Sequence, residues 1–290
     1  MGMKAISLAV ILAACGGSGP SVGDDVVPPP PGGDGSVTPP EPDANLACTG
    51  VTSTDVAGKI TANQTWSDNI NLTASINIAA GVTVTVMPGT IIHIPENATI
   101  GLAGTLDIQG TKQCTVVGRS TTPGQFWQGI SVVTGGELIA HYYNQTGGGI
   151  HTTGTGKATI IDSTMSNCSG DWLVMGGGTV DVEYSWIGVE EGLTDTSHCD
   201  LHFGGTAANT IKVTHTNLST SSYGMMFYNG LNADLTFNNW FGNLHDIDTT
   251  VAMPVTGDLS NGWFERGAPA IQGLTANNMA TARLSDAGPR

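Results

Sequence analysis

The chain has 290 residues, enough for one large domain or two ordinary ones, but only 11% of them are charged. It contains 41 glycines, and its 24 acidic residues outnumber 9 basic residues, which gives a formal net charge of −15. This composition argues against a helical bundle, and the acidic excess disfavours nucleic-acid partners because it repels phosphate groups. It favours an all-β protein with many turns.

The N-terminus carries one basic residue, Lys4, followed by an apolar run that ends at Cys15. The run is too short to span a bilayer as a helix, and residues 1–14 are typical of a secretory signal peptide. The sequence Leu-Ala-Ala-Cys that ends at Cys15 resembles the lipobox of bacterial lipoproteins. The alternative is a plain cleaved signal peptide followed by an incidental cysteine.

The resemblance to lipoproteins implies that Cys15 is acylated and becomes the first mature residue, which makes the membrane a partner through the lipid. Gly16 follows, and no Asp stands there to retain the protein at an inner membrane. The resemblance therefore implies a bacterial outer-membrane or cell-surface location. Residues 15–44 are rich in Pro, Gly and acidic residues without apolar periodicity, so we interpret them as an extended spacer.

The body of the chain, residues 59–265, alternates apolar and polar residues in runs of three to five, as in Val82-Thr-Val-Thr-Val86. Such runs, ended by Gly, Asn, Ser or Thr, predict short strands with turns between them. Similar runs recur along the chain, and their spacing of 20 to 50 residues indicates stacked repeats. Their central apolar residues are Ile161, Val182, Val213 and Phe237, at spacings of 21, 31 and 24 residues.

With these repeats the chain resembles the right-handed parallel β-helix proteins, a group that includes the pectate-lyase-like solenoids, and in particular β-helix surface lipoproteins. The resemblance implies an all-β, right-handed, single-stranded parallel β-helix over residues 59–265. Residues 45–66 are then an N-terminal cap, and residues 266–290 a C-terminal cap or tail. The alternatives are a β-sandwich or a propeller, both of which favour antiparallel hairpins with Asn-Gly turns. Asn-Gly pairs are rare in the body, where Asn229-Gly230 is one of two.

Four cysteines follow Cys15 and allow three pairings in an oxidising compartment. We predict Cys48–Cys114, near the cap, and Cys168–Cys199, which lie about one long coil apart. The second bridge would tie down an insertion over residues 188–197. The alternative is that one or both pairs are buried thiols.

A segment from His198 to His202 offers His198, Asp200 and His202 as weak candidates for metal ligands. On a strand these three side chains face one way and Cys199 faces the other, so we predict no metal site and no cofactor. We interpret this segment instead as a disulfide cysteine beside polar surface or turn residues.

Many β-helix proteins cleave acidic polysaccharides, so a polysaccharide lyase or glycoside hydrolase is the enzyme alternative. A lyase of that kind needs a base, and residues 120–264 hold only Lys157 and Lys212 as basic residues. The Gly-His-Gly and Arg-x-Lys motifs of the related hydrolases are absent from the sequence. We therefore predict a protein without catalytic residues.

Two non-catalytic roles remain, binding or adhesion on the one hand and surface structure on the other. Partners would be glycans or copies of the chain itself, the latter in a surface layer or filament. Aromatic side chains are the candidates for contact with a glycan, although recurrent aromatics in a coil usually pack inside it. They are Trp127, Trp172, Trp186, Tyr223, Tyr228 and Trp240.

Overall fold

The computed structural model describes residues 48–190, 192–204, 210–227, 232–248 and 256–290. The predicted signal peptide, Cys15 and the predicted spacer lie outside these residues, as does Tyr228. The described residues form strands and turns without a helix, so no helix among them is long and apolar enough to cross a membrane.

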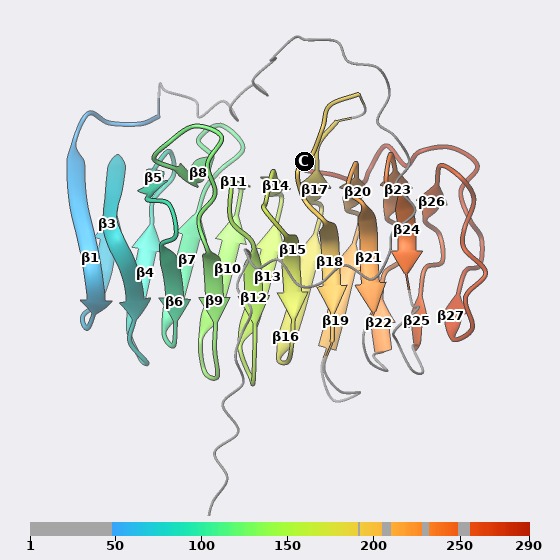
Figure 1. Ribbon diagram of the computed structural model, residues 1–290, viewed down its shortest axis with the longest axis horizontal. Coiled ribbons are helices and arrows are strands. Elements are labelled where there is room, and N and C mark those ends of the chain that lie inside the picture. The colour runs from blue at the N-terminus through green and yellow to red at the C-terminus, as the bar shows by residue number, and fades with distance from the viewer. Residues whose placement is uncertain (1–47, 191, 205–209, 228–231, 249–255) are drawn as a thin grey trace, which may run out of the picture.

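The strands stack in parallel and wind into a solenoid, which confirms the predicted parallel β-helix (Figure 1). A typical coil contributes one strand to each of three faces. Two long strands, β1 (Ser53–Ile60) and β3 (Asn69–Ile78), begin the stack and pair over most of their length. β3 then pairs with the first strands of both face 2 and face 3.

Face 1 is a separate ten-stranded sheet, whereas faces 2 and 3 are two rows of one seventeen-stranded sheet. The strands of face 1 are β2 (Gln64–Trp66), β4 (Thr83–Val86), β7 (Thr105–Gln109), β10 (Glu137–His141), β13 (Lys157–Ile161), β16 (Thr179–Glu183), β19 (Thr210–Thr214), β22 (Asn232–Asp234), β25 (Thr256–Asp258) and β27 (Leu274–Thr275). Those of face 2 are β5 (Ile91–Ile94), β8 (Val116–Ser120), β11 (Tyr143–Thr146), β14 (Thr164–Ser166), β17 (Trp186–Gly188), β20 (Asn217–Ser219), β23 (Asn239–Phe241) and β26 (Trp263–Phe264). Those of face 3 are β6 (Thr99–Leu102), β9 (Gly129–Val132), β12 (Ile150–Thr152), β15 (Asp171–Met175), β18 (Cys199–Phe203), β21 (Tyr223–Phe227) and β24 (His245–Asp248).

Alternation of side chains along each strand builds the core. In β4, β7 and β10 the second and fourth residues are buried and their neighbours are at least partly exposed. Because successive strands pair in register, the inward Val, Ile and Leu side chains of one coil lie directly on those of the next. The result is one apolar core that runs from Ile60 to Phe264.

The register on face 1 corrects the repeat spacing expected from the sequence. Thr159 pairs with Asp181, Asp181 with Lys212, and Lys212 with Asp234, so the true spacings are 22, 31 and 22 residues. Ile161 therefore lies beside Glu183 rather than Val182. A shift of one residue moves the apolar side chains of a strand to its opposite face. The alignment in the structure places inward residues on inward residues, whereas the alignment from the sequence repeat did not.

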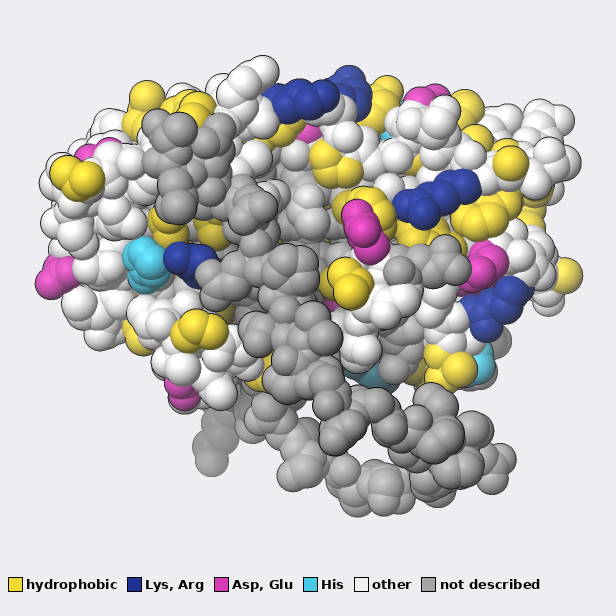
Figure 2. Space-filling view, turned by 90° about the horizontal axis from the view of Figure 1, so that it is seen from above, with side chains coloured by type: hydrophobic (Ala, Val, Ile, Leu, Met, Phe, Trp, Pro, Cys, Tyr) yellow, Lys and Arg dark blue, Asp and Glu magenta, His cyan; other side chains and the backbone are white. Residues whose placement is uncertain are grey.

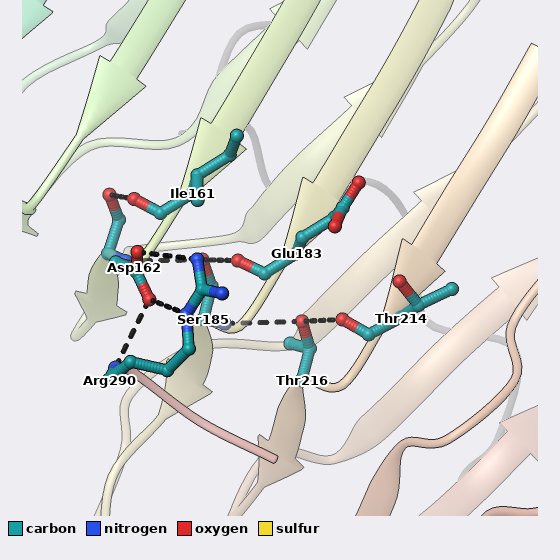
Figure 3. Close-up of polar contacts among 8 residues, drawn as sticks. Ile161, Asp162, Glu183, Ser185, Thr214, Thr216 and Arg290 are labelled. Carbon is teal, nitrogen blue, oxygen red and sulfur yellow. Dashed lines mark hydrogen bonds and ion pairs between the residues drawn. The ribbon is translucent and has the colours of Figure 1, made fainter. Parts of the chain in front are cut away.

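At the corner between faces 1 and 2, a residue in the left-handed region precedes a buried polar side chain. Asp162, Tyr184 and His215 have φ values of 47° to 51°. The next residue in each coil is Ser163, Ser185 or Thr216, and each backbone N–H donates to the side-chain oxygen at that position in the following coil, at 2.8 to 3.4 Å. Figure 3 shows the bond from Ser185 to Thr216. This ladder satisfies amide groups that turn inward where the strands are interrupted.

The C-terminal residues form more than the cap expected from the sequence. β27 pairs with β25 and covers the end of face 1. Residues 276–290, the return segment, then run back along the corner, so the C-terminus lies beside β14 and β17 (Figure 1). Leu284 N–H donates to Asn239 Oδ1 at 2.8 Å, and Gly288 N–H donates to the carbonyl of His215 at 2.8 Å.

The return segment ends in an ion pair with a residue 128 positions earlier. The Arg290 Nε and Nη2 atoms donate to the two carboxylate oxygens of Asp162, each at 3.0 Å, and the backbone N–H of Arg290 adds a third hydrogen bond at 3.1 Å. The guanidinium also lies over the ring of Tyr184, 3.7 Å from its centroid. A fork-like pair of this kind fixes direction as well as distance, so it holds the segment in place.

A disulfide joins Cys48 to Cys114 at a Cα–Cα distance of 5.5 Å, which is the pairing predicted from the sequence. Gly89 lies between the two partners. A Cβ atom on Gly89 would come within 2.9 Å of Cys48, and the Gly89 N–H donates to the carbonyl of Cys114. Glycine at this position therefore lets three neighbouring coils approach closely enough for the bridge to form.

Replacing both Cys48 and Cys114 by alanine is expected to lower the free energy of unfolding by about 4 kcal/mol, because the bridge closes a loop of 66 residues in the unfolded chain. Chemical denaturation under non-reducing conditions measures the difference. As a control, a reductant should destabilise the parent protein and leave the double variant unchanged. Equal stability of the two proteins in oxidising buffer would contradict the prediction.

Candidate functional site

Three of the aromatic candidates for glycan binding lie in the core, which corrects the sequence interpretation. Trp127, Trp172 and Trp240 are 0–1% exposed. The Trp127 ring packs under Gly148, where an added Cβ would approach it to 2.5 Å, and Trp240 stacks on Phe264 with 5.3 Å between ring centroids. These indoles fill the coil and cannot meet a ligand at the surface.

Two other candidates, Trp186 and Tyr223, are partly exposed. The Arg283 guanidinium of the return segment lies 5.2 Å from the Trp186 ring centroid, and the Trp186 N–H donates to Ser219 Oγ at 2.8 Å. Tyr223 stacks on the exposed ring of His245 with 5.2 Å between centroids. Trp186 is therefore engaged by the chain itself, and Tyr223 is the aromatic candidate best placed to contact a ligand.

A groove of about 500 Å³ lies where the return segment crosses β17 and β20. Trp186 and Asn217 line one side of it, and residues 283–289 supply most of the other. The Arg283 guanidinium lies 3.9 Å from the ring centroid of Phe241, so one wall of the groove is held by a cation–π contact.

The predicted Cys168–Cys199 disulfide is wrong for this structure, in which both residues are buried thiols. Cys199 pairs in register with Asp171, whereas Cys168 lies in the turn before β15. The Cys168 thiol donates to the Asp171 carbonyl at 3.5 Å, and the Gly170 N–H donates to its sulfur at 3.4 Å. The predicted spacing was close to the length of this coil. However, Cys168 lies three residues before Asp171, and Asp171 is the residue that lies beside Cys199.

Asp171 brings together three further side chains of metal-ligating types, from β18 and from the turn before it. His198 Nδ1 lies 3.0 Å from Asp171 Oδ1, and His202 Nδ1 lies 2.5 Å from Asp171 Oδ2. The Cys199 sulfur lies 3.4 Å from His198 Nδ1. Ligand atoms of Asp171, Cys199 and His202 all lie within 4.8 Å of one another. We call Asp171, His198, Cys199 and His202 the HCDH cluster.

Asp200 was a candidate metal ligand from the sequence, together with His198 and His202, but it does not join the HCDH cluster. It is fully buried, between the strand positions of Cys199 and Leu201. Burial, followed by the charge of Asp195, raises the pKa of Asp200 well above its usual range. Its carboxyl group is not among the ligand atoms that lie within 4.8 Å of one another.

The electrostatics of the cluster follow from the central carboxylate. Burial would raise the pKa of Asp171, but the hydrogen bonds from His198 and His202 outweigh it and lower that pKa below its usual range. The hydrogen bond to Asp171 raises the pKa of His198. Burial, together with the Asp171 charge, raises the pKa of Cys199 above its usual range. The Cys199 side chain is therefore a thiol, not a thiolate, at neutral pH.

The two candidate bases of the lyase alternative lie on face 1. Lys157, at the start of β13, is exposed. The Lys212 ammonium forms ion pairs with Glu183 and, at 3.6 Å, with Asp181. Desolvation alone would lower the pKa of Lys212, but these two carboxylates raise it above its usual value. The lysine is held in its protonated form, which is unsuited to removing a proton.

Searches against protein-family models, curated proteins and solved structures find no match to this chain.

Sequence reasoning missed Asp171, the residue on which the HCDH cluster depends. It lies 27 residues before His198, and no local motif links the two. An alignment of β15, β18 and β21 by strand position could have found it, because Asp171, Cys199 and Tyr223 share one register position.

Replacing Lys212 by methionine is expected to destabilise the protein at pH 7 by up to about 1 kcal/mol, because it leaves Asp181 and Glu183 without their cation on a partly exposed face. Burial raises the pKa of Asp181, and the ion pair opposes that rise. The cost should therefore shrink as the pH falls and the carboxylates become protonated. Thermal unfolding at pH 7 and about pH 4 measures it.

Lys157→Met is the matched control, since it removes an exposed lysine two coils away on the same face. It should show no pH-dependent change. An equal loss of stability at both pH values in Lys212→Met would show that the side chain acts by packing rather than by charge.

Proposed function

We propose that the chain is a lipid-anchored β-helix displayed at a bacterial outer membrane or cell surface, where it acts as a rigid, non-catalytic rod. The observation that carries this proposal is the uninterrupted apolar core from Ile60 to Phe264, enclosed by strands that pair in register. The Cys48–Cys114 bridge fastens one end, and the return segment fastens the coils near the other. Such a body resists bending and suits display or surface structure.

The sequence before the body supports display at a distance from a membrane. A lipid on Cys15 would hold the chain, and residues 15–44 would separate it from the β-helix. A Pro-rich spacer of this length reaches roughly 90 Å when extended, at ~3.1 Å per residue. Acidic residues in the spacer favour extension because like charges repel.

The distribution of charge also favours a role without catalysis on acidic polysaccharides. On the face shown in Figure 2, basic side chains lie at separate positions, with acidic, polar and hydrophobic side chains between them. A lyase that acts on polyuronates needs cations near the substrate carboxylate and a base poised to lose its proton. The protonated Lys212 and the exposed Lys157 offer neither. A polysaccharide lyase or glycoside hydrolase remains the enzyme alternative.

Glycan binding is a second candidate function, favoured by the exposed aromatic row on face 3. Tyr223 and His245 occupy one register position in β21 and β24, and their rings are stacked with an interplanar angle of 19°. The rings of His198 and Tyr223 meet edge-on, with 5.1 Å between their centroids. A row of amphipathic rings on a rigid sheet can pack against a sugar and donate hydrogen bonds at its rim. Self-assembly between copies of the chain is the remaining structural alternative.

Replacing Cys15 by serine is expected to move the protein from the membrane fraction to the soluble extracellular or periplasmic fraction, because acyl chains supply its attachment. Immunoblots of fractionated cells and detergent partitioning measure the change. Cys168→Ser is the control, since it removes a buried thiol from the body and should stay with the membrane. Unchanged partitioning of Cys15→Ser would remove the anchor from the proposal.

A glycan array probed with the detergent-purified full chain tests the second candidate. If face 3 binds a sugar, Tyr223→Ala should weaken binding about tenfold or more, because stacked aromatics dominate such contacts. Phe237→Ala is the matched control, since Phe237 is 37% exposed and lies at the corner between faces 1 and 2. Absence of any glycan signal, or equal loss in both variants, would reject binding through this row.

A further inference from the structure

The HCDH cluster combines the donor types that transition metals prefer and takes them from two neighbouring coils. β18 supplies Cys199 and His202, and the turn before it supplies His198. β15 supplies Asp171, which is in register with Cys199. One imidazole, one thiol and one carboxylate thus have ligand atoms within 4.8 Å of one another, and the second imidazole, that of His198, contacts the carboxylate and the thiol. This set is typical of a tetrahedral zinc site and unlike the all-oxygen sites of calcium or magnesium.

The spacing of the donor atoms is close to that of a metal centre. In a tetrahedral zinc site with bonds of about 2.0–2.3 Å, neighbouring ligand atoms lie roughly 3.3–3.7 Å apart. The Cys199 sulfur and His198 Nδ1 are 3.4 Å apart, and the contacts of Asp171 with the two imidazoles measure 2.5 and 3.0 Å. The two imidazoles contact different oxygens of Asp171, so binding of one ion by all four residues would require the His198 ring to turn toward His202.

Charge balance also fits a divalent ion. Zinc carries two positive charges, and the carboxylate of Asp171 and the thiolate of Cys199 carry one negative charge each, so the loaded centre is neutral. A neutral centre limits the cost of enclosing charge beside the core, where Cys199 is 0% exposed. Binding would release the thiol proton of Cys199, along with any proton that a ligating imidazole nitrogen carries. The side chain of His198 is 53% exposed, which leaves the ion a path from solvent.

The long turn between β17 and β18 gives such a site a structural purpose. This turn has ten residues where the preceding coil has four, and Asp195 organises its end by accepting hydrogen bonds from the N–H groups of Asn167 and Ser197 at 3.0 and 2.7 Å. The HCDH cluster lies directly after it. A metal there would tie the turn to the preceding coil, which is the role that the sequence assigned to a Cys168–Cys199 bridge.

We propose that Asp171, His198, Cys199 and His202 bind one Zn²⁺ ion that fastens the long turn between β17 and β18 to the neighbouring coil. The site does not depend on the membrane anchor or on glycan binding, so it stands or fails separately from the proposed function.

Cobalt is the probe, because a cobalt–thiolate bond gives a charge-transfer absorption and a tetrahedral site gives strong visible bands. The full chain, purified in detergent and freed of metal with a chelator, should bind one equivalent of Co²⁺ with both signals, and Zn²⁺ should displace it. Cys199→Ser should abolish the charge-transfer absorption and weaken zinc binding by more than about 100-fold. His202→Ala should weaken zinc binding similarly.

Matched variants separate the site from general effects on folding. Cys168→Ser removes the other buried thiol, and His93→Ala removes a histidine on face 2, far from the cluster. Both should bind the metal as the parent does, and circular dichroism confirms that each variant is folded. His198→Asn, at an exposed position, serves if Cys199→Ser does not fold. Absence of the thiolate signal in the parent, or unchanged zinc affinity in folded Cys199→Ser or His198→Asn, would overturn the proposal.

Discussion

In-register stacking of parallel strands is the constraint on which the rest of this structure depends. Each coil satisfies its backbone hydrogen-bonding groups only through the coils on either side, so a residue at one position lies directly above its counterpart in the next coil. Inward positions consequently become one continuous apolar column, and corner positions become a ladder of buried hydroxyl groups. Outward positions become rows in which chemically different side chains are forced into contact.

The outward rows explain why sites form from residues far apart in the sequence. Lys212 lies between Asp181 and Asp234 because the register places it there, and Asp171 meets Cys199 for the same reason. Two longer connections, the larger of them between β17 and β18, change the sequence spacing from 22 to 31 residues without disturbing the register that follows. The fold therefore tolerates insertions at its corners while the faces keep their order, and the HCDH cluster lies where one such insertion rejoins the sheet.

The sequence was sufficient for the fold class and for one bridge, but not for the register. Alternation such as Val82-Thr-Val-Thr-Val86 identifies strands, and repetition identifies stacking, because both depend on local periodicity. Whether Thr159 meets Asp181 or Val180 is decided by packing between coils, and a slip of one residue placed Ile161 on the wrong partner. The same limit hid Asp171 from the candidate metal ligands and suggested Cys168 as a partner for Cys199. The ion pair of Arg290 with Asp162 was equally hidden, because no periodicity marks residues 276–290.

Disulfide mapping of the register tests this account most directly. In a chain with Cys168→Ser and Cys199→Ser, the pair Thr159→Cys and Asp181→Cys should cross-link under mild oxidation. In-register neighbours lie about 4.8 Å apart, within the range that a disulfide spans. The account predicts that peptide mapping finds this link, and that the pair Thr159→Cys and Val180→Cys remains reduced. A link to position 180 instead of position 181 would contradict the register and, with it, every contact between coils described above.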